Sequence, residues 1–457
     1  MSLSNTIAAV ATPMGTGGIG VIRISGAQSV TIAERVFRAV NGRKISDLDG
    51  YTALYGHIIK DGEMIDEAVA LYFKAPHSYT GEDVIELSVH GGQYIVSTVL
   101  RTVLENGARL AENGEFTRRA YENGKLDLTE AEAVMALISA KSENARRAAM
   151  AAKNGTVSRK IAEIRDFLVN CASDLAAYTD YPDEDLDNLE SGIFKENLIK
   201  SRDMLAKLLD NYDSGKMLRE GIDTVIVGSP NVGKSTLMNL LSGENRVIVT
   251  DIPGTTRDIV EETVTLFDLT LRLSDTAGIR ITDDMAEAIG VEKALSKLET
   301  AQLILAVFDA SKYITDADTA LLEKCAGRPV VVLMNKTDLV ENVQADEKIA
   351  RFNFPIINIS ALSTDSLPAL HDVIMRVCAL HEISDDEPML QTERQRSLAQ
   401  NAHTAVCEAI DALNSGFTLD AAGVCLDSAL AELLLLTGER VTNTVADDLF
   451  RRFCVGK

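Results

Sequence analysis

The chain has 457 residues, which at about 150 residues per domain suggests roughly three domains. It carries 45 basic (Lys and Arg) and 68 acidic (Asp and Glu) residues, a formal net charge of −23, and its hydrophobic fraction of 46% excludes a wholly disordered chain. The charge excludes nucleic-acid binding through bulk charge and leaves only local patches for it. Tryptophan is absent and aromatic residues make up only 5%, which disfavours base-stacking platforms.

The cysteines are widely spaced, and no two of them form a C-x-x-C pair. This spacing excludes a zinc ribbon and disfavours a disulfide scaffold, so we expect a reducing compartment. The first basic side chain is Arg23, unlike the start of a signal peptide, and no apolar run approaches the ~20 residues of a membrane span. We therefore expect a cytoplasmic protein that does not enter a membrane. The cysteines are Cys171, Cys325, Cys378, Cys407, Cys425 and Cys454.

Residues 1–125 have the texture of a mixed α+β domain. Short β-rich runs alternate with glycine-containing turns, and the stretch 94–104 is typical of a helix. The expected strands are 20–24, 54–59, 69–73 and 84–89.

Two patterns in this first domain resemble ligand motifs. Residues 15–20 match G-x-G-x-x-G, but a strand-like run follows where a dinucleotide-binding fingerprint needs a helix. We interpret them as a turn or as a loop near a ligand. His90 has no second His or Cys at ligand spacing, so we expect no metal site there.

Two regions with helical patterns, 126–220 and 381–457, flank a segment with a different pattern. In the first, Thr129 and Glu132 have the spacing of a capping box, and apolar residues recur three and four apart over 161–175. The acidic segment 181–185 interrupts this pattern, and another helix runs to about residue 218. The second region carries two apolar stripes, Leu398, Ala402, Ala405, Ala409 and Leu413, and then Val424, Leu426, Leu430, Leu433 and Leu434.

Residues 221–380 between them predict a doubly wound α/β domain. Near-continuous apolar runs of the kind buried on both faces of a parallel sheet alternate with helical segments. The simplest interpretation is one helical domain with the α/β domain inserted in it; the alternative is two separate helical domains. The expected strands are 224–227, 270–274, 303–308 and 330–334.

Residues 228–235, GSPNVGKS, match the phosphate-binding pattern G-x-x-x-x-G-K-[ST]. A strand-like run ends at Val227 before them and a helical run begins at Thr236, as the mechanism requires. The glycines let backbone N–H groups converge on phosphates, Lys234 reaches the β- and γ-phosphate oxygens, and Ser235 binds Mg²⁺. We interpret the segment as a nucleotide-binding P-loop.

Three further motifs follow strand-like runs, in the order typical of guanine-nucleotide-binding proteins. Residues 275–278, DTAG, can hold Mg²⁺ through water and sense a γ-phosphate. Residues 335–338, NKTD, end in a carboxylate that can accept both N–H groups of a guanine edge, whereas adenine presents the wrong pattern. Residues 360–362, SAL, supply a backbone N–H toward the base oxygen. The chain is therefore predicted to bind a guanine nucleotide.

The segment between the P-loop and DTAG takes the place of a first switch. Thr256 in it can complete the Mg²⁺ shell only while a γ-phosphate is present. Gly278 is followed by Ile279 rather than by a water-orienting Gln, and no arginine finger in the same chain is identifiable. Another group must therefore position the water and neutralise the transition-state charge.

The sequence ends in Cys454-Val455-Gly456-Lys457. The basic side chains of Arg451, Arg452 and Lys457 would lower the pKa of the Cys454 thiol. Taken alone, this pattern is typical of an incidental cysteine on a frayed tail.

The motifs GSPNVGKS, GTTRD, DTAG and NKTD, inside a helical region that ends in CVGK, resemble the MnmE (TrmE) family of bacterial and organellar tRNA modification GTPases. The stretches ATPMGTGGIGVIRISG, TGEDVIELSVHGG and NGKLDLTEAEA are also similar to that family, so the resemblance covers the whole chain. The GTPase motifs alone are shared with Era-like ribosome-assembly GTPases. The terminal CVGK together with this N-terminal domain is far more specific.

The resemblance implies a multidomain α+β and α/β architecture. An N-terminal α+β domain (1–125) would bind folate and form the dimer. A discontinuous helical domain (126–220 and 381–457) would hold an inserted doubly wound P-loop GTPase domain (221–380).

The resemblance also implies an activity. The family acts as a homodimer with a flavoprotein partner, MnmG, and adds a carboxymethylaminomethyl-type group to C5 of the wobble uridine in certain tRNAs. Its one-carbon source is 5-formyl-tetrahydrofolate or a related folate. By motif match the folate contacts are Arg23, Glu86, Lys125 and Lys457, whose charges suit folate carboxylates and a pterin edge.

The family is further potassium-activated, and K⁺ takes the place of an arginine finger. The resemblance assigns K⁺ to Asn231, Thr250, Ile252 and Thr255, Mg²⁺ to Ser235 and Thr256, and water orientation to Glu287. The implied catalytic residues are Glu287, Lys234 and Cys454, where Cys454 acts directly in the modification or only packs beside the folate. The residues expected to bind GTP are Asn231, Val232, Gly233, Lys234, Ser235, Thr236, Thr250, Asp251, Ile252, Pro253, Gly254, Thr255, Thr256, Asp275, Thr276, Ala277, Gly278, Asn335, Lys336, Asp338, Ser360 and Ala361.

Two other functions compete with this one. A ribosome-assembly switch that binds rRNA would normally carry an RNA-binding module, but no KH-like GxxG segment or basic tail is evident. A signalling scaffold would leave the terminal CVGK unexplained. The sequence therefore favours a tRNA-modifying GTPase.

Overall fold

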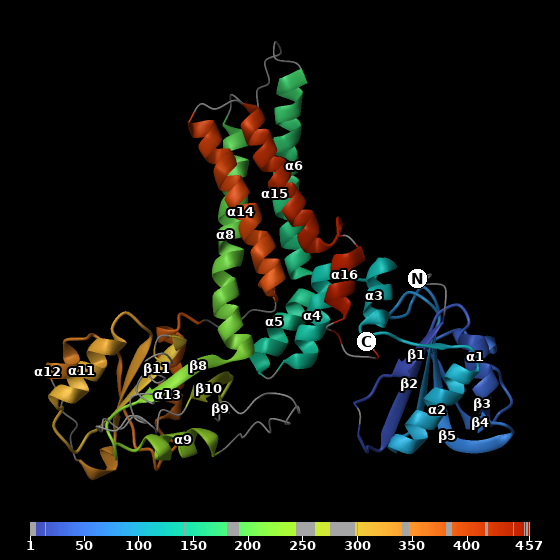
Figure 1. The fold of residues 1–457 in the computed structure, drawn as a ribbon, viewed down its shortest axis with the longest axis horizontal. Coiled ribbons are helices and arrows are strands. Elements are labelled where there is room, and N and C mark those ends of the chain that lie inside the picture. The colour runs from blue at the N-terminus through green and yellow to red at the C-terminus, as the bar shows by residue number, and fades with distance from the viewer. Residues whose placement is uncertain are drawn as a thin grey trace, which may run out of the picture. The chain divides into compact units, whose positions relative to one another are not determined.

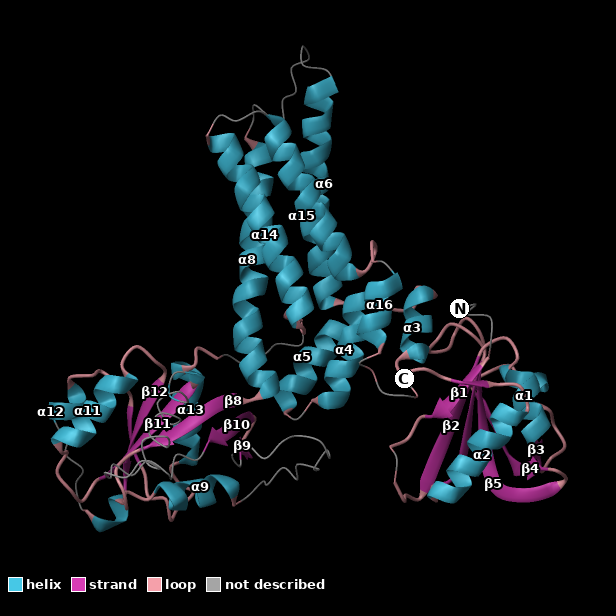
Figure 2. Cartoon of the chain, viewed as in Figure 1, coloured by secondary structure: helices cyan, strands magenta, loops and turns pink. Residues whose placement is uncertain are grey.

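In the computed structural model the chain forms two compact units. The first consists of residues 1–135, 158–202 and 397–457, and the second of residues 136–157 and 203–396. Figure 1 shows the elements in chain order, and Figure 2 distinguishes helices from strands. None of the helices in the described ranges is long and apolar enough to cross a membrane. The described residues are 6–13, 15–140, 142–180, 192–243, 261–274, 298, 300–340, 347–380, 386–415, 419–441, 443–451, 453 and 456.

The N-terminal part of the first unit is a sheet of seven strands in the order β3-β4-β5-β6-β2-β1-β7. Neighbouring strands pair antiparallel except β1 and β7, which are parallel. Alternate residues such as Ile22 and Ile24 are fully buried against helices α1 and α2, together with Val99 and Val103 of α2. The elements are β1 (Ile7–Val10), β2 (Ile19–Ser25), α1 (Ser29–Val36), β3 (Phe37–Ala39), the 3₁₀ turn η1 (Ile45–Asp47), β4 (Thr52–Lys60), β5 (Glu63–Phe73), β6 (Val84–His90), α2 (Gln93–Glu105), β7 (Arg109–Leu110) and α3 (Glu115–Glu122).

The four strands predicted in this domain and the helix over 94–104 are all present. Strand β5 begins six residues earlier than predicted, at Glu63, because the charged residues Glu63, Asp66 and Glu67 interrupt the apolar run in its first half. The short strands β1, β3 and β7 were not predicted.

Long helices form the helical regions. Their packing within the first unit follows from a few contacts: Lys195 of α8 donates to Asn414 of α14 at 2.7 Å, and Gly423 of α15 lies beside Leu175 of α6. The helices are α4 (Leu128–Ser139), α5 (Glu143–Lys153), α6 (Thr156–Asp180), α8 (Ile193–Glu220), α14 (Glu393–Asn414), α15 (Leu419–Thr437) and α16 (Asn443–Phe450).

The predicted apolar stripe of α14 is buried at Ala402, Ala405 and Ala409. The stripe predicted for α15 was wrong at Val424, whose side chain is 71% exposed. The buried positions of that helix recur at three- and four-residue steps that begin two residues earlier, so Val424 falls on the opposite face. These buried residues are Ala422, Leu426, Ala429, Leu433 and Leu436.

The cap of α4 also differs from the prediction. Asp127 precedes this helix, and its Oδ1 accepts a hydrogen bond from the Glu130 N–H at 2.8 Å. In return, Glu130 Oε2 accepts from the Asp127 N–H at 2.9 Å. The prediction that Thr129 and Glu132 form the capping box was wrong because Asp127 and Glu130 have the same spacing and begin the helix earlier. The Thr129 hydroxyl donates to Asp127 at 2.7 Å instead.

The second unit contains a six-stranded sheet in the order β13-β12-β11-β8-β10-β9. All pairs are parallel except β9–β10, so the expected doubly wound sheet has an antiparallel edge strand that was not predicted. Both faces are buried, one against α9 and α13 and the other against α11, which explains the continuous apolar runs. The elements are β8 (Ile222–Val227), α9 (Lys234–Ser242), β9 (Glu261–Leu266), β10 (Leu269–Ser274), β11 (Leu303–Asp309), α11 (Asp316–Cys325), β12 (Val330–Asn335), the 3₁₀ turn η2 (Thr337–Leu339), α12 (Glu347–Ala350), β13 (Ile356–Asn358) and α13 (Leu367–Val377).

The turn between β9 and β10 is anchored within the second unit through one carboxylate. Asp268 Oδ2 accepts from Asn144 Nδ2 of α5 at 2.9 Å, and Asp268 Oδ1 lies 2.6 Å from His371 Nε2 of α13. Phe267 contacts the His371 ring edge-on. This hairpin connects two segments of the expected nucleotide site, so its anchoring fixes Glu261, which follows the first segment, and Ser274, which precedes the second.

Replacing the cap of α4 tests the corrected assignment. Asp127→Ala should lower the free energy of unfolding by about 1 kcal/mol, because the Glu130 N–H and the Thr129 hydroxyl lose the carboxylate that accepts from them. Asp127→Asn is the matched control and should retain most of the stability, since Asn also caps well. Urea unfolding of the full chain, followed through its first transition, measures both. Equal stability of Asp127→Ala and the wild type would contradict the assignment.

Candidate functional site

The P-loop leaves the carboxyl end of β8 and enters α9, as the motif requires. Its two glycines both have positive φ values, +148° for Gly228 and +101° for Gly233. A Cβ on Gly228 would lie 2.2 Å from the carbonyl oxygen of Val307, and one on Gly233 would lie 2.2 Å from Asn335 Nδ2. Both positions therefore exclude a side chain, and the loop is held tightly against β11 and the end of β12.

The polar side chains of the P-loop lie where phosphates would be bound. Lys234 Nζ donates to the carbonyl oxygens of Gly228 and Ser229, at 2.7 and 2.9 Å, and so curls over the loop. Ser235 and Thr236 are exposed at the start of α9, where no side chain caps the helix. The first backbone N–H groups of a helix attract anions, so this end of α9 suits a phosphate.

A single buried amide connects the P-loop to the base-recognition motifs. Asn335, only 1% exposed, donates from Nδ2 to the Val232 carbonyl at 2.8 Å. Its Oδ1 accepts from the Ala361 N–H at 2.9 Å. The first residue of NKTD thus links two distant segments. Val232 of the P-loop precedes Asn335 by 103 residues, and Ala361 of the SAL segment follows it by 26 residues. We expected the SAL segment to supply a backbone N–H toward the base oxygen, and of its three N–H groups that of Ala361 is bonded to Asn335.

The remaining base-recognition residues follow on the same side of the sheet. Asp338 is exposed, and its Oδ1 accepts from the Ser360 hydroxyl at 2.6 Å. This bond leaves Oδ2 to accept from a base edge and holds the carboxylate beside the SAL segment. The structure therefore brings together residues 231–236, 335–338 and 360–361 at the carboxyl ends of β8 and β12, where open α/β sheets bind their ligands.

Two carboxylates at this site were not predicted. Asp309, at the end of β11, accepts from Lys336 Nζ at 2.7 Å, and Lys336 also donates to the Asn231 carbonyl at 2.7 Å. Burial alone would raise the pKa of Asp309, but hydrogen bonds from Lys336 and Ser311 outweigh it and lower the pKa to about 2. The only indication of Asp309 in the sequence was its position, one residue beyond the predicted strand 303–308.

The second unpredicted carboxylate is Asp318, in the first turn of α11. Its Oδ1 accepts from the Ser229 hydroxyl of the P-loop at 2.6 Å. Burial would raise the pKa of Asp318, but bonds from Ser229 and Thr315 lower it overall. Thr315 and Asp318 form a capping box whose T-x-x-D spacing was readable in the sequence, although the link to Ser229 was not.

The two switch segments lie outside the described residues, but the described strands fix where they begin. The register of the β9–β10 hairpin pairs Glu261 with Ser274, and Ser274 also pairs with Val225 of β8. Glu261 and Ser274, the described residues that adjoin segments 250–260 and 275–297, therefore lie at the same end of the sheet, and Ser274 lies beside the strand that carries the P-loop. The predicted site residues outside the described ranges are Thr250, Asp251, Ile252, Pro253, Gly254, Thr255, Thr256, Asp275, Thr276, Ala277, Gly278, Glu287, Cys454 and Lys457.

In the first unit, three of the four residues implied to contact folate are described. Strand register places Arg23 opposite Glu86, and Arg23 Nε donates to Glu86 Oε1 at 2.8 Å. Arg23 Nη1 also donates to the carbonyl of Gly456 at 3.2 Å, so the C-terminal tail reaches this pair. The guanidinium lies 5.8 Å from the Tyr79 ring and 5.6 Å from the Phe116 ring.

The third residue, Lys125, contacts the loop that carries Tyr79. Its Nζ donates to the Pro76 carbonyl at 3.1 Å. A Cβ on Gly81 would lie 3.4 Å from Lys125 Cγ, so this loop packs closely on the lysine. The structure thus connects Lys125 to the Arg23–Glu86 pair through residues 76–81, without a direct contact between them in the described part.

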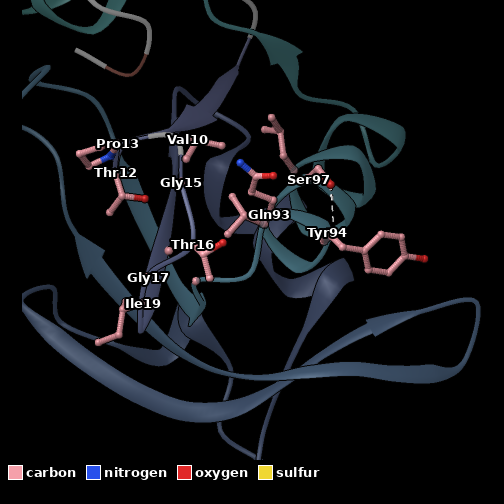
Figure 3. Close-up of a pocket in the computed structure, with 14 residues that line it drawn as sticks. Val10, Thr12, Pro13, Gly15, Thr16, Gly17, Ile19, Gln93, Tyr94 and Ser97 are labelled. Atoms are coloured by element: carbon pink, nitrogen blue, oxygen red, sulfur yellow. Dashed lines mark hydrogen bonds between the residues drawn. The ribbon is translucent and has the colours of Figure 1, made fainter. Parts of the chain in front are cut away.

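The glycine-rich stretch 15–20 lines a pocket of about 720 Å³ (Figure 3). It is followed by strand β2, as expected, and not by the helix of a dinucleotide-binding motif. Figure 3 shows Gln93, Tyr94 and Ser97, from the start of α2, on one side of this pocket and the β1–β2 loop on the other. Gly20 must lack a side chain, since a Cβ there would lie 2.3 Å from Val96. Arg23 belongs to the opposite face of β2 from Gly20, so the pocket is distinct from the Arg23–Glu86 pair.

The structure gives His90 a carboxylate partner. His90 Nδ1 lies 2.6 Å from Asp66 Oδ1, and this hydrogen bond raises the pKa of the exposed His90 ring. Within the described residues no group of three or more His, Cys, Asp or Glu side chains could hold a metal ion. The five described cysteines are free thiols, in agreement with the sequence expectation.

The chain is similar to known proteins over its whole length. The family "GTP-binding protein TrmE N-terminus" matches residues 6–125, and the family "MnmE helical domain" matches residues 128–454. A protein of Clostridioides difficile (strain 630) named tRNA modification GTPase MnmE is 41% identical over 460 residues, with full coverage of both chains. Proteins of the same name from Geobacillus thermodenitrificans (strain NG80-2) and Acetivibrio thermocellus are 40% and 37% identical, each covering both chains completely. An Era structure from Aquifex aeolicus is 27% identical with a TM-score of 0.28, over 40% of this chain and 66% of that chain.

Exchanging the base-recognition carboxylate tests the site. Asp338→Asn should weaken GDP binding about a hundredfold, because an amide donor would face the guanine N–H groups. The same variant should gain affinity for xanthosine diphosphate, whose oxygen in that place accepts the amide donor. Titration with fluorescent derivatives of both nucleotides measures the change. Asp372→Asn, at an exposed position of α13, is the matched control, and an unchanged preference for GDP in Asp338→Asn would refute the assignment.

Proposed function

Because the chain belongs to the MnmE (TrmE) family and is a GTP-hydrolysing enzyme of tRNA modification, we propose that it adds a carboxymethylaminomethyl-type group to C5 of the wobble uridine in certain tRNAs. It acts as a homodimer with the flavoprotein MnmG and takes its one-carbon unit from 5-formyl-tetrahydrofolate or a related folate. Potassium-activated GTP hydrolysis opens and closes the GTPase domains. One observation carries the proposal: a guanine-nucleotide site and a charged N-terminal site reached by the C-terminal tail occur in one chain.

GTP binding in this proposal uses the described geometry directly. Lys234 leaves the loop carbonyls and donates to the β- and γ-phosphate oxygens, while the first N–H groups of α9 bind the same phosphates. The Ser235 hydroxyl is exposed at the start of the helix and suits Mg²⁺, with Thr256 as a further ligand. Bound Mg²⁺ neutralises phosphate charge as the γ-phosphate departs.

The proposed K⁺ site takes its described ligand from the P-loop. Asn231 is exposed in the left-handed conformation, φ +64°, so its side-chain oxygen is accessible beside the phosphates. Oxygen ligands of Thr250, Ile252 and Thr255 complete the set. A bound K⁺ supplies the positive charge that an arginine finger supplies in other GTPases.

Glu287 is proposed to orient the attacking water through a second water. Glu287→Ala should reduce kcat about a hundredfold or more and leave GDP affinity nearly unchanged, since the carboxylate acts only on the water. Single-turnover GTP hydrolysis and nucleotide titration measure the two quantities. Glu287→Gln separates charge from size, and unchanged turnover in the alanine variant would remove Glu287 from the mechanism.

The folate proposal rests on the fit of the residues around Arg23. Its side chain is 18% exposed and its guanidinium lies within 6 Å of two aromatic rings, at 5.8 Å from Tyr79 and 5.6 Å from Phe116, so a partly exposed cation is available to a carboxylate. Glu86 offers an acceptor for the N–H donors of a pterin ring, and Lys125 and Lys457 add positive charge for folate carboxylates. The bound folate would supply the one-carbon unit.

Cys454 is proposed to act directly in the modification step. It lies two residues before Gly456, whose carbonyl is bonded to Arg23, and it directly follows the buried Phe453. Gly456 is the described residue that brings the tail to the proposed folate site, and Cys454 precedes it by only two residues in the sequence. If tRNA were fully modified by a Cys454→Ser chain, Cys454 would have only a packing role.

Complementation tests the proposed function. The wild-type chain is expressed in a bacterium that lacks its own such GTPase, and the tRNA nucleosides are analysed by mass spectrometry. Return of C5-aminomethyl-type wobble uridines is the expected result. Persistent absence of these nucleosides, with GTP hydrolysis intact in the purified chain, would favour a ribosome-assembly switch instead.

A further inference from the structure

Two carboxylates that lie outside the P-loop motif are connected to it by hydrogen bonds. Both belong to residues 309–318, the segment that ends β11 and begins α11. Asp309 reaches the loop through Lys336, and Asp318 reaches it through Ser229. One contact is made to Ser229 and the other to Asn231, so residues 229–231 are held on both sides of Pro230.

The first contact sets the orientation of the peptide group between Asn231 and Val232. The Asp309 side chain is 3% exposed, and it fixes the Lys336 ammonium with a 2.7 Å ion pair. The same ammonium donates to the Asn231 carbonyl at 2.7 Å. In a trans peptide the C=O of one residue and the N–H of the next point in opposite directions. Holding the Asn231 carbonyl toward Lys336 therefore turns the Val232 N–H to the other side of the loop.

This contact also maintains an unfavourable conformation. Asn231 has φ +64°, in the left-handed region that L-residues other than glycine rarely adopt. Asparagine tolerates this region better than most residues, but a second interaction is needed to keep it there in a loop without a ligand. The ion pair of Asp309 and Lys336 provides that interaction.

The second contact uses a rigid helix end. Asp318 is 7% exposed, and its Oδ2 accepts from the Thr315 N–H and hydroxyl at 3.0 and 2.7 Å. Its Oδ1 is thereby aimed at the Ser229 hydroxyl, 2.6 Å away. The capping box of α11 thus serves as an anchor for the second residue of the P-loop.

We propose that Asp309 and Asp318 are positioning residues of the GTPase site, which shape residues 229–231 before the nucleotide binds. Asp309 acts through Lys336, and Asp318 acts through Ser229. This proposal rests on the guanine-nucleotide part of the proposed function and extends it: the same residues set the orientation of Asn231, and therefore the response of hydrolysis to K⁺.

A double-mutant cycle on the full chain tests the first arm. Asp309→Asn should weaken binding of a fluorescent GDP derivative about tenfold, mostly through faster release. In a Lys336→Met background the same substitution should change the affinity less than twofold, because the lysine through which Asp309 acts is gone. Asp309→Asn should also raise the K⁺ concentration for half-maximal hydrolysis severalfold.

Matched variants keep the test decisive. Asp316→Asn removes an exposed carboxylate of the same helix, paired with Lys348 on the surface, and should leave every reading unchanged. Ser229→Ala removes the other contact, leaves Asp318 bonded to Thr315, and should weaken GDP binding about threefold. This milder variant decides the question if Asp309→Asn does not fold.

Three results would overturn the proposal: wild-type GDP affinity in both Asp309→Asn and Ser229→Ala, additive effects of Asp309→Asn and Lys336→Met, or an unaltered K⁺ response in a variant with weakened GDP binding. These readings concern nucleotide binding and hydrolysis by the purified chain. They can hold when tRNA modification is not restored in cells, and they can fail when it is, so the two proposals are tested separately.

Discussion

The nucleotide site depends on one buried amide. Asn335 joins the Val232 carbonyl of the P-loop to the Ala361 N–H of the SAL segment, and it lies so close to the P-loop that position 233 must be glycine. Because the amide donates on one side and accepts on the other, a carboxylate or an apolar side chain could not make both bonds. The spacing between the phosphate end and the base end of the site is therefore set before a nucleotide binds.

The parallel sheet makes this connection possible. Strands β8, β11 and β12 run in the same direction, so the segments that follow them emerge at one edge although they are far apart in the sequence. The P-loop, Asp309 and the NKTD motif all lie at this edge. The antiparallel strand β9 turns the chain back, and Glu261 and Ser274, which adjoin the two switch segments, are consequently paired at one end of the sheet.

Sequence reasoning predicted the parts of this arrangement that depend on local pattern. The P-loop and NKTD could be placed because each motif directly follows an apolar strand. The contacts of Asp309 with Lys336 and of Asp318 with Ser229 join residues 27 and 89 positions apart, and no local pattern encodes them. Strand β9 was missed because an edge strand with charged residues lacks the continuous apolar run of a buried one. The cap of α4 was misplaced because two overlapping pairs of residues fit the same capping pattern.

The most direct measurement of the central claim is calorimetric titration of the full wild-type chain and of Asn335→Ala with GDP and with ADP. The account predicts that the wild-type chain binds GDP and not ADP, and that Asn335→Ala binds neither while its circular dichroism spectrum is preserved. Tight GDP binding by a folded Asn335→Ala chain would contradict the account, because the two ends of the site would then be aligned without the buried amide.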